Sequence, residues 1–257
     1  MDMSNPIQRK VFLDLHAGLP RQSCGSAAST LHALEIVKTR LQDNPYIADF
    51  GCGPGSSVIP LATALPNANF IALDLYPPFI DELNQRTQDA ELSNPIEARA
   101  GDMLSPDIAS HSLDLIWCEG AIYNTGIARA LKQWFDYLKP TGCIVFNEPI
   151  WLTSESDRPA PLKNFWSAYP GMTDNDGVRT AIKSAGFDIF ESFDLPEQDW
   201  WDEYYNALEA RLELLEEQYF GDESARIPLT YSRTEIAMRR KYAAHYNYRF
   251  YCVEPDR

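Results

Sequence analysis

Residues 47–55 read Ile47-Ala48-Asp49-Phe50-Gly51-Cys52-Gly53-Pro54-Gly55. An apolar run passes directly into three alternating glycines, and a pattern typical of a helix follows. Glycine lets the backbone adopt positive φ and approach a ligand closely, and the first turn of the next helix offers unpaired N–H groups. In open α/β sheets, ligands bind at the carboxyl ends of the strands, where this loop lies. The segment therefore predicts a strand, a ligand-binding turn and a helix of an α/β fold.

The spacing of these glycines helps to decide whether the loop binds a dinucleotide or a cationic ligand. Dinucleotide-binding loops follow the pattern GxGxxG, whereas here the glycines stand at positions 51, 53 and 55 and position 56 is serine. Asp49 precedes the first glycine, and a carboxylate at this point is poorly placed for a pyrophosphate. It suits a ligand that carries a positive charge. The pattern therefore favours a cationic ligand over a dinucleotide.

Short apolar runs alternate with helical patterns along the chain, which indicates βαβ units and a mainly parallel sheet. We expect a Rossmann-like, doubly wound α/β fold with helices on both faces and an antiparallel C-terminal edge hairpin. The strands expected are 46–50, 70–74, 96–100, 113–118, 142–147, 187–193 and 248–253. The helices expected are 26–42, 58–65, a segment through 80–83, 127–138, 178–184, a long acidic helix through 208–219, and 234–245. Residues 149–176 look irregular.

Two further carboxylates follow strands that we expect beside the first one. Asp74 ends the second strand, where a carboxylate can accept two hydrogen bonds from a ribose diol. Dinucleotide enzymes use the same arrangement, so Asp74 alone does not separate the two kinds of ligand. Ala100-Gly101-Asp102-Met103 follows the third strand, and taken alone it is typical of an Asx turn.

Taken together, these segments resemble class I S-adenosylmethionine (SAM) dependent methyltransferases. The resemblance implies that the glycine loop lies under the methionine part of SAM and that Asp49 helps to hold its amino group. It implies that Asp74 binds the ribose and Asp102 the adenine amine, with Met103 packed on the ring. The cofactor-binding residues implied are Arg21, Asp49, Gly51, Cys52, Gly53, Gly55, Asp74, Leu75, Gly101, Asp102, Met103 and Glu119.

The resemblance extends beyond the first loop. Residues 113–124 resemble the family's fourth-strand motif, which borders the transferred methyl, and the string WCEGAIYN is similar to the W[SC]EGAIYN of one uncharacterised bacterial subgroup. Pro20-Arg21-Gln22 with Gly25 is similar to that subgroup's PRQxPG segment. We therefore expect a single methyltransferase domain over 1–257. Its parts would be an N-terminal lid and helix (1–45), a SAM-binding core (46–148) and a C-terminal half with substrate-shaping insertions (149–257).

Four side chains are candidates for the chemistry: Glu119 and Tyr123 after the fourth strand, Glu148 after the fifth, and His16 in the N-terminal segment. Methyl transfer requires an acceptor at near-attack distance and the exclusion of water. It requires a base only if the nucleophile must lose a proton. Each candidate has a structural alternative, because a strand-end carboxylate also bonds the backbone and a lone histidine is more often a surface or core residue.

Aromatic side chains cluster after the fifth strand. Trp151, Trp166 and Tyr169 stand where the family inserts substrate-shaping loops, and aromatic rings can build an apolar pocket or surround a cation. Packing between helix and sheet is the alternative, and we favour it for Trp200 and Trp201. The run Glu213, Glu216 and Glu217 is interpreted as the solvated face of a helix.

The composition narrows the partners. The 257 residues carry 37 acidic and 22 basic side chains, a net charge of −15, which is unfavourable for nucleic acid or an acidic membrane. The five cysteines form no CxxC pair and no cluster with zinc spacing, so we expect no metal and a reducing, cytoplasmic location. No stretch approaches the roughly 20 apolar residues that span a bilayer.

The sequence therefore predicts a SAM-dependent methyltransferase that acts on a small-molecule acceptor by in-line displacement, as a monomer or homodimer. Two alternatives remain open: an NAD(P)- or flavin-dependent oxidoreductase on a related sheet, and a protein that binds SAM without turnover. The glycine spacing and Asp49 argue against the first. Intact motifs do not decide against the second, and they do not identify the acceptor or the atom that is methylated.

Overall fold

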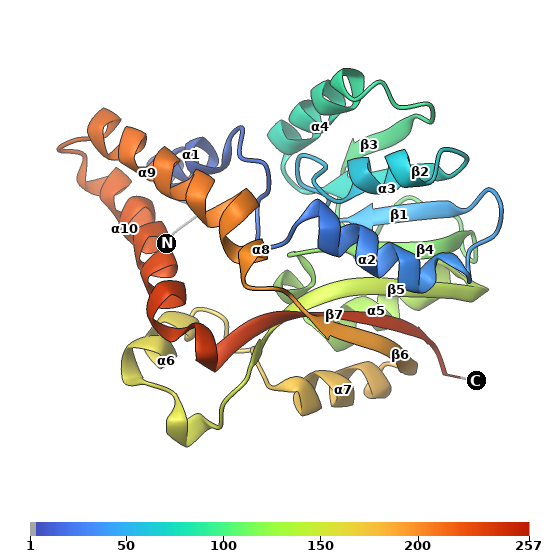
Figure 1. Cartoon of the computed structure of the whole chain (residues 1–257). Coiled ribbons are helices and arrows are strands. Elements are labelled where there is room, and N and C mark those ends of the chain that lie inside the picture. The colour runs from blue at the N-terminus through green and yellow to red at the C-terminus, as the bar shows by residue number, and fades with distance from the viewer. Residues whose placement is uncertain (1–3, 257) are drawn as a thin grey trace.

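The computed structural model describes residues 4–256 and contains one seven-stranded sheet in the order β3-β2-β1-β4-β5-β7-β6 (Figure 1). The strands are β1 (Tyr46–Phe50), β2 (Asn69–Asp74), β3 (Ile96–Ala100), β4 (Leu113–Cys118), β5 (Leu138–Trp151), β6 (Phe187–Asp194) and β7 (Tyr246–Pro255). The first five strands pair in parallel, and β7 runs antiparallel between β5 and β6. The predicted fold class is confirmed.

The position of β1 explains where a ligand can bind. β1 lies between β2 and β4, so the chain builds the sheet first to one side of β1 and then to the other. Crevices at such switch points open at the carboxyl ends of the strands, where connecting loops part to opposite faces. The glycine-rich segment leaves β1 at this point.

Helices cover both faces of the sheet. The helices are α1 (Pro6–His16), α2 (Ala27–Lys38), α3 (Val58–Ala64), α4 (Pro77–Asp89), α5 (Ile127–Trp134), α6 (Ala160–Trp166), α7 (Asn175–Ser184), α8 (Gln198–Trp200), α9 (Asn206–Gln218) and α10 (Glu223–Tyr242). Short turns are η1 (Ile122–Asn124), η2 (Phe135–Tyr137), η3 (Glu155–Asp157), η5 (Ala243–His245) and the π-helical turn η4 (Trp201–Tyr205). One core packs α2, α3 and α4 against the sheet, and the other packs α5 and α7 against the opposite face.

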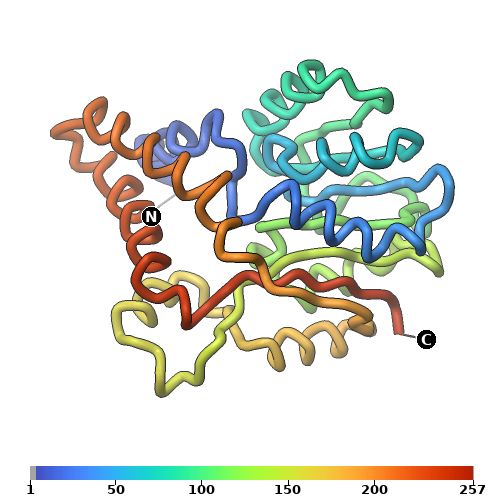
Figure 2. The backbone as a smooth tube through the Cα atoms, viewed as in Figure 1, coloured from blue at the N-terminus to red at the C-terminus, as the bar shows by residue number. Residues whose placement is uncertain are grey.

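A separate helical layer stands at the carboxyl ends of the parallel strands. Helix α1 contacts α9 and α10, which also contact each other, although they come from opposite ends of the chain (Figure 2). Asn5 caps α1 by accepting from the N–H groups of Ile7 and Gln8, and Pro6 occupies the first turn. Buried Val11 and Leu15 join α1 to the core shared with α9 and α10. This layer faces the switch point and bounds the region where a ligand would lie.

The elements nearest the glycine loop were predicted best. The bounds of β1, β3 and β4 agree with the prediction, whereas β5 extends well beyond 142–147 and α10 begins well before position 234. Helix α1 was not predicted, and the stretch expected to be irregular contains the end of β5 and α6. The two antiparallel strands are joined through α8 to α10 instead of a tight hairpin turn, and β6, not β7, forms the edge of the sheet.

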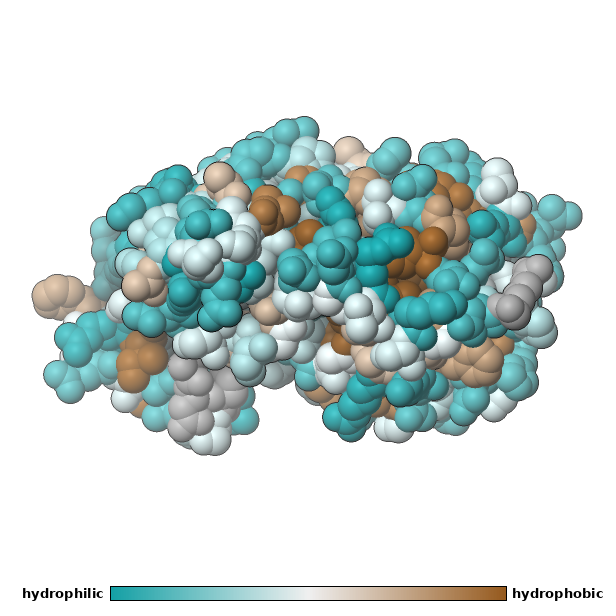
Figure 3. All heavy atoms as spheres, turned by 90° about the horizontal axis from the view of Figure 1, so that it is seen from below, coloured by the Kyte–Doolittle hydropathy of each residue, from teal (hydrophilic) through white to brown (hydrophobic). Residues whose placement is uncertain are grey.

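The face in Figure 3 is mostly hydrophilic, in keeping with the acidic composition. Glu213, Glu216 and Glu217 are exposed on α9, which agrees with the solvated face inferred for them. None of the helices in residues 4–256 combines the length and apolar character needed to cross a membrane. Within the same residues, His, Cys, Asp and Glu side chains form no group of three or more suited to hold a metal ion.

Candidate functional site

The loop after β1 is a tight turn that only glycine can form. Gly51, Gly53 and Gly55 have φ values of +74°, +51° and +94°, a region that side chains with a Cβ disfavour. A Cβ on Gly51 would overlap the Cβ of Ala121. The N–H groups of Gly51 and Cys52 both donate to the carbonyl of Leu73, at 2.8 and 3.0 Å, and so hold the turn against β2.

Asp49 is buried at the end of β1 with one oxygen unused. Its side chain is 1% exposed, and Oδ2 has no hydrogen-bond partner within the described chain. Burial raises the pKa of Asp49 well above its ordinary value, and the charges of Glu119 and Asp74 raise it further, while Arg21 acts in the opposite direction. A cationic ligand beside Oδ2 would relieve this energetic cost.

Asp74 connects the glycine loop to the end of β2. Its two oxygens each accept one backbone N–H at 2.9 Å, Oδ2 from Gly53 and Oδ1 from Tyr76. Burial raises the pKa of Asp74, and these backbone bonds oppose the rise. Each carboxylate oxygen has more than one lone pair, so both can still accept a bond from a ligand.

The segment after β3 forms a turn beside β2. Asp102 is exposed, and its Oδ1 accepts from the N–H of Leu104 at 2.8 Å, so the Asx turn recognised in the sequence is present. Gly101 donates to the carbonyl of Asp74 at 2.9 Å. Met103 is buried, and Leu75 is 65% exposed. The structure therefore brings all the carboxylates implied by the resemblance to the carboxyl ends of β1, β2 and β3.

The N-terminal segment crosses these strand ends. A Cβ on Gly120, just after β4, would overlap the Oγ of Ser23, so the Ser23 side chain lies directly against the backbone of Gly120. Arg86 on α4 donates to the carbonyl groups of Leu19 and Pro20, at 2.6 and 3.3 Å. This segment therefore lies over the glycine loop, where a lid would be expected.

Arg21 and Glu119 form a buried ion pair between the N-terminal segment and the end of β4. Arg21 Nη2 donates to Glu119 Oε2 at 3.1 Å and to Thr30 Oγ1 at 3.0 Å. Glu119 Oε1 accepts from Thr30 and from the indole of Trp117, both at 2.8 Å. Three protein donors thus occupy Glu119, which makes it a positioning residue for Arg21.

His16 ends α1 and is buried. Its Nδ1 lies 2.7 Å from the carbonyl oxygen of Phe12, and its ring packs on that of Phe12 with centroids 4.2 Å apart. Burial lowers the pKa of His16. Gln22 donates to the His16 carbonyl at 3.0 Å. The side chain is therefore held by α1, and its backbone supports the segment over the loop.

Glu148 and Tyr123 lie at the carboxyl end of the sheet, with Tyr169. The Tyr169 hydroxyl donates to Glu148 Oε1, and the rings of Tyr123 and Tyr169 meet edge to face with centroids 5.7 Å apart. Glu148 is 1% exposed, and its Oε2 has no partner among the described residues. Burial raises the pKa of Glu148 to about 8. These three predicted residues form one cluster.

The remaining tryptophans belong to an aromatic core. Trp151 is 7% exposed and packs edge-to-face against Trp166 and Tyr246, at centroid distances of 6.3 and 6.5 Å. Trp166 is partly exposed, and its Nε1 is unpaired within residues 4–256. Trp200 is 1% exposed and lies under the guanidinium of Arg239, in agreement with the packing role inferred for it.

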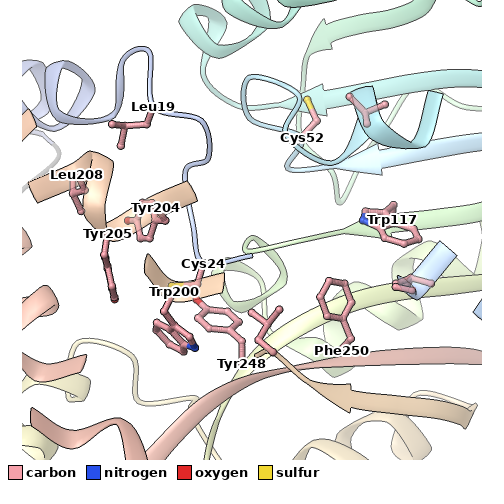
Figure 4. Close-up of a cluster of buried hydrophobic side chains, with 14 of the residues drawn as sticks. Leu19, Cys24, Cys52, Trp117, Trp200, Tyr204, Tyr205, Leu208, Tyr248 and Phe250 are labelled. Carbon is pink, nitrogen blue, oxygen red and sulfur yellow. The ribbon is translucent and has the colours of Figure 1, made fainter. Parts of the chain in front are cut away.

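The side chains that α10 and the turn before α9 add to this region were not predicted from the sequence. Tyr204 and Tyr205 project from the π-helical turn η4, and Figure 4 shows them near Trp200 and Tyr248. Glu235 on α10 accepts from the hydroxyl of Tyr205 at 3.0 Å. Such π-helical turns are frequent at functional sites. No sequence motif marks this one, so it could not be predicted.

Known proteins resemble this chain most clearly over the strands around the glycine loop. Residues 47–142 match the family model described as "Methyltransferase domain". A solved SAM-dependent methyltransferase from Thiobacillus denitrificans, in complex with S-adenosyl-L-homocysteine, has a TM-score of 0.79 at 17% identity, over 96% of this chain and 98% of that one. At this identity the likeness concerns the fold. The family match includes Asp49, Asp74 and Asp102 and supports the resemblance to class I methyltransferases.

Two curated relatives match parts of the chain. A malonyl-[acyl-carrier protein] O-methyltransferase from Dechloromonas aromatica is 30% identical over 143 residues, which are 56% of this chain and 44% of that protein. A tRNA (guanine-N(7)-)-methyltransferase from Syntrophotalea carbinolica is 28% identical over 120 residues, 42% of this chain and 51% of that protein. The chain therefore spans about half or less of the length of these relatives, which are named for different acceptors.

Proposed function

We propose that this chain is a SAM-dependent methyltransferase that transfers the methyl group to a small-molecule acceptor by in-line displacement. The observation that carries the proposal is the glycine loop after β1 with two carboxylates beside it, the half-buried Asp74 and the buried Asp49, whose Oδ2 is unpartnered. SAM would supply a methyl group on a positively charged sulfur. All other steps depend on how the residues of this chain bind and orient the two reactants.

The residues present fit SAM. Its amino group matches the unpartnered Oδ2 of Asp49, and its ribose hydroxyls match the remaining lone pairs of Asp74. The cradle formed by Gly51, Gly53 and Gly55 allows close approach of the backbone. The negative charges of Glu119 and Asp74 both raise the pKa of Asp49. A ligand that carries positive charge would therefore bind favourably beside these three carboxylates.

The other predicted contacts complete the same ligand. Asp102 and Met103 are proposed to hold the adenine, with Leu75 and Gly101 beside it, because they stand at the ends of β2 and β3. The solved structure of the Thiobacillus denitrificans protein in complex with S-adenosyl-L-homocysteine supports a ligand of this kind. The segment over the loop, fixed by the Arg21–Glu119 pair, is proposed to exclude water during transfer.

Glu148 and Tyr123 are the candidates that the geometry favours on the acceptor side. Glu148 is buried with a free oxygen, and its raised pKa suits a group that accepts a proton near neutral pH. Glu119 is occupied by three donors, and His16 is bonded to its own helix, so both are less suited to proton transfer. The net charge of −15 supports a small acceptor over nucleic acid, and the five free thiols support a cytoplasmic location.

Calorimetric titration of the purified protein with SAM, S-adenosylhomocysteine and NAD tests the proposal. We expect micromolar binding of the first two ligands and none of NAD. Binding of NAD alone would favour the oxidoreductase alternative. Binding of the first two without methyl transfer to any acceptor in a broad screen would favour a SAM-binding protein without turnover.

A further inference from the structure

Two carboxylates without a cationic partner lie near a group of tyrosines at the carboxyl end of the sheet. Glu148 belongs to β5 and Glu235 to α10, so they approach this region from the sheet and from the helical layer. Each accepts one tyrosine hydroxyl, Glu148 from Tyr169 and Glu235 from Tyr205. A hydroxyl satisfies part of a carboxylate but does not neutralise it, so either a proton or a cationic ligand must do so.

Among residues 4–256, no free cation is found to interact with Glu148. The ionisable groups that interact electrostatically with it are Cys118, Tyr123, Tyr169, Tyr248 and Tyr251. Its register partner on β7, Arg249, is engaged in a two-point ion pair with Asp194, at 2.6 and 2.9 Å. With Oε2 unpartnered and the side chain 1% exposed, Glu148 can bind one more donor from a ligand.

Glu235 and Tyr123 are recessed and still accessible. Both side chains are partly accessible to solvent, yet burial raises the pKa of Glu235 to about 7 and that of Tyr123 to about 12. The groups that interact with Glu235 include Cys24, Tyr123, Tyr204, Tyr231 and Tyr248.

The two carboxylates share neighbours among the tyrosines. Tyr123 and Tyr248 each interact with both Glu148 and Glu235, and Tyr123 lies against Tyr169, which holds Glu148. The cluster thus combines carboxylates from two elements with tyrosines that interact with both. Aromatic faces and carboxylates both attract cations, whereas two carboxylates without a free cation repel an anionic acceptor.

We propose that Glu148 and Glu235, together with Tyr123 and Tyr169, bind a small organic ammonium ion, and that the methyl acceptor is therefore an aliphatic amine. The assignment rests on the proposed methyltransferase function and specifies its substrate class. A carboxylate acceptor would need a free cation at this position. Arg21 is paired with Glu119, and Arg239 is paired with Glu197 and with the carbonyl of Tyr246.

The chemistry balances with the groups present. The bound ammonium transfers one N–H proton to a carboxylate oxygen of Glu148, which frees the nitrogen lone pair. That lone pair forms the new N–CH₃ bond as the S–CH₃ bond of the methyl donor breaks, and the electron pair of the broken bond remains on sulfur. The products are an N-methylammonium ion, S-adenosylhomocysteine and a protonated Glu148, which releases its proton to water.

Binding of benzyltrimethylammonium tests the cation site without requiring the true acceptor. This ion keeps its charge at every pH, and 3-phenylpropanoate serves as an anion of similar size. Both are titrated calorimetrically into the full chain, with and without S-adenosylhomocysteine, between pH 6 and pH 9. Glu148→Gln, Glu235→Gln and, as a matched control on an exposed helix face, Glu213→Gln are measured in the same way.

We expect the cation to bind at least about tenfold more tightly than the anion, because desolvated charge pairs contribute strongly. Its affinity should rise as the pH passes through about 8, where Glu148 loses its proton, and Glu148→Gln should remove both this rise and at least about tenfold of the affinity. Glu235→Gln should weaken binding as well, and Glu213→Gln should not.

Three outcomes would overturn the assignment: equal or tighter binding of the anion, unchanged cation binding in Glu148→Gln, or no cation binding at millimolar concentration. Any of these alongside normal binding of S-adenosylhomocysteine would reject the amine and leave the methyltransferase proposal intact. If the chain binds the cation but not S-adenosylhomocysteine, the cation site exists without the proposed cofactor. The methyltransferase proposal would then be rejected.

Discussion

Two regions of the molecule build their parts of the site in different ways. The first consists of the ends of strands β1 to β4, and the second of the end of β5 with the helical layer. In the first region, Asp49, Asp74 and Asp102 each stand at or just after the end of a strand, and the backbone N–H groups that Asp74 and Asp102 bind are close in sequence or on the adjacent loop. In the second, Glu148 and Glu235 come from β5 and α10 and are bonded by tyrosine hydroxyls from other segments. The residues of the first region therefore belong to short sequence motifs, whereas those of the second come together only in the folded chain.

The carboxylates of the two regions also differ in the hydrogen-bond donors that surround them. Asp74 gains two backbone hydrogen bonds that favour its charged form. Glu148 and Glu235 each gain one hydroxyl, and burial raises the pKa of both toward or above neutrality. Burial raises the pKa of Asp49 in the first region as well, so the two regions differ in the donors that their carboxylates receive: backbone N–H groups at Asp74, and tyrosine hydroxyls at Glu148 and Glu235.

Among these variants, Arg21→Met should lower the free energy of unfolding most strongly, because Arg21 joins the two regions. Arg21 contacts Glu119 at the end of β4 and lies 3.7 Å from Glu203 on η4, with 3% of its side chain exposed. Arg21→Met would leave the buried Glu119 unpaired, which costs about 3–5 kcal/mol of folding free energy. Urea unfolding measures the loss. Arg21→Met combined with Glu119→Gln should recover part of it, and a single-variant loss below about 1 kcal/mol would contradict the role of the pair.

A substitution in the glycine loop should have the next largest effect. Gly51→Ala places a Cβ against Ala121 at a positive φ, for an expected cost of about 2–4 kcal/mol from strain and overpacking together. Gly126→Ala is the matched control, because Gly126 also has a positive φ of +81° but its added Cβ would have nothing within 4 Å. Equal losses in urea unfolding would show that the contact with Ala121 is unimportant.

The raised pKa of Glu148 predicts that stability depends on pH. The folded protein holds this proton more tightly, with a pKa of about 8, than an unfolded chain with the ordinary value of 4.5. Glu148 therefore destabilises the fold increasingly as the pH rises from about 4.5 to about 8, by up to ~1.4 kcal/mol per pH unit. Glu148→Gln should remove this dependence and unfold at higher urea than the wild type at pH 7.5, but not at pH 4.5. Parallel curves for both proteins would mean that Glu148 is ionised in the fold.

The smallest effect is expected at the exposed edge of the first region. Asp102→Ala should weaken S-adenosylhomocysteine binding by about 1 kcal/mol, roughly fivefold, because it removes one hydrogen bond at an accessible site. With an analogue that lacks the exocyclic amine of adenine, wild type and variant should bind alike. An equal loss for the analogue would assign the effect to the Asx turn with Leu104 instead.

The sequence predicted the first region well because its signals are local. The turn from β1 needs glycine at fixed positions, and β1, β3 and β4 are bounded by breaks in apolar pattern, so their ends agree with the structure. Helix α1 carried a local signal too, because Asn5-Pro6 is a typical helix start. The start of α10 was missed because Pro228 lies inside the helix, where proline normally breaks one.

The second region could not be predicted, because its residues meet only through packing of distant segments. Tyr169 was expected in the acceptor region, but its bond to Glu148 depends on how the chain returns after α6. Glu235 stands within a helix without any motif, and the insertion of β7 between β5 and β6 brings the preceding α10 to the site. Glu119 was expected near the acceptor, and its use by Arg21, Thr30 and Trp117 follows from contacts across 89 or more positions for two of the three partners.

The most direct test of two separate functions compares S-adenosylhomocysteine binding in Asp74→Ala and Glu148→Gln by calorimetry. We predict that Asp74→Ala weakens binding by about 2 kcal/mol, roughly thirtyfold, because a charge-assisted pair of hydrogen bonds to the ribose is lost. Glu148→Gln should bind S-adenosylhomocysteine as the wild type does. Equal losses in the two variants, or normal binding by Asp74→Ala, would contradict the division of the molecule into a cofactor region and an acceptor region.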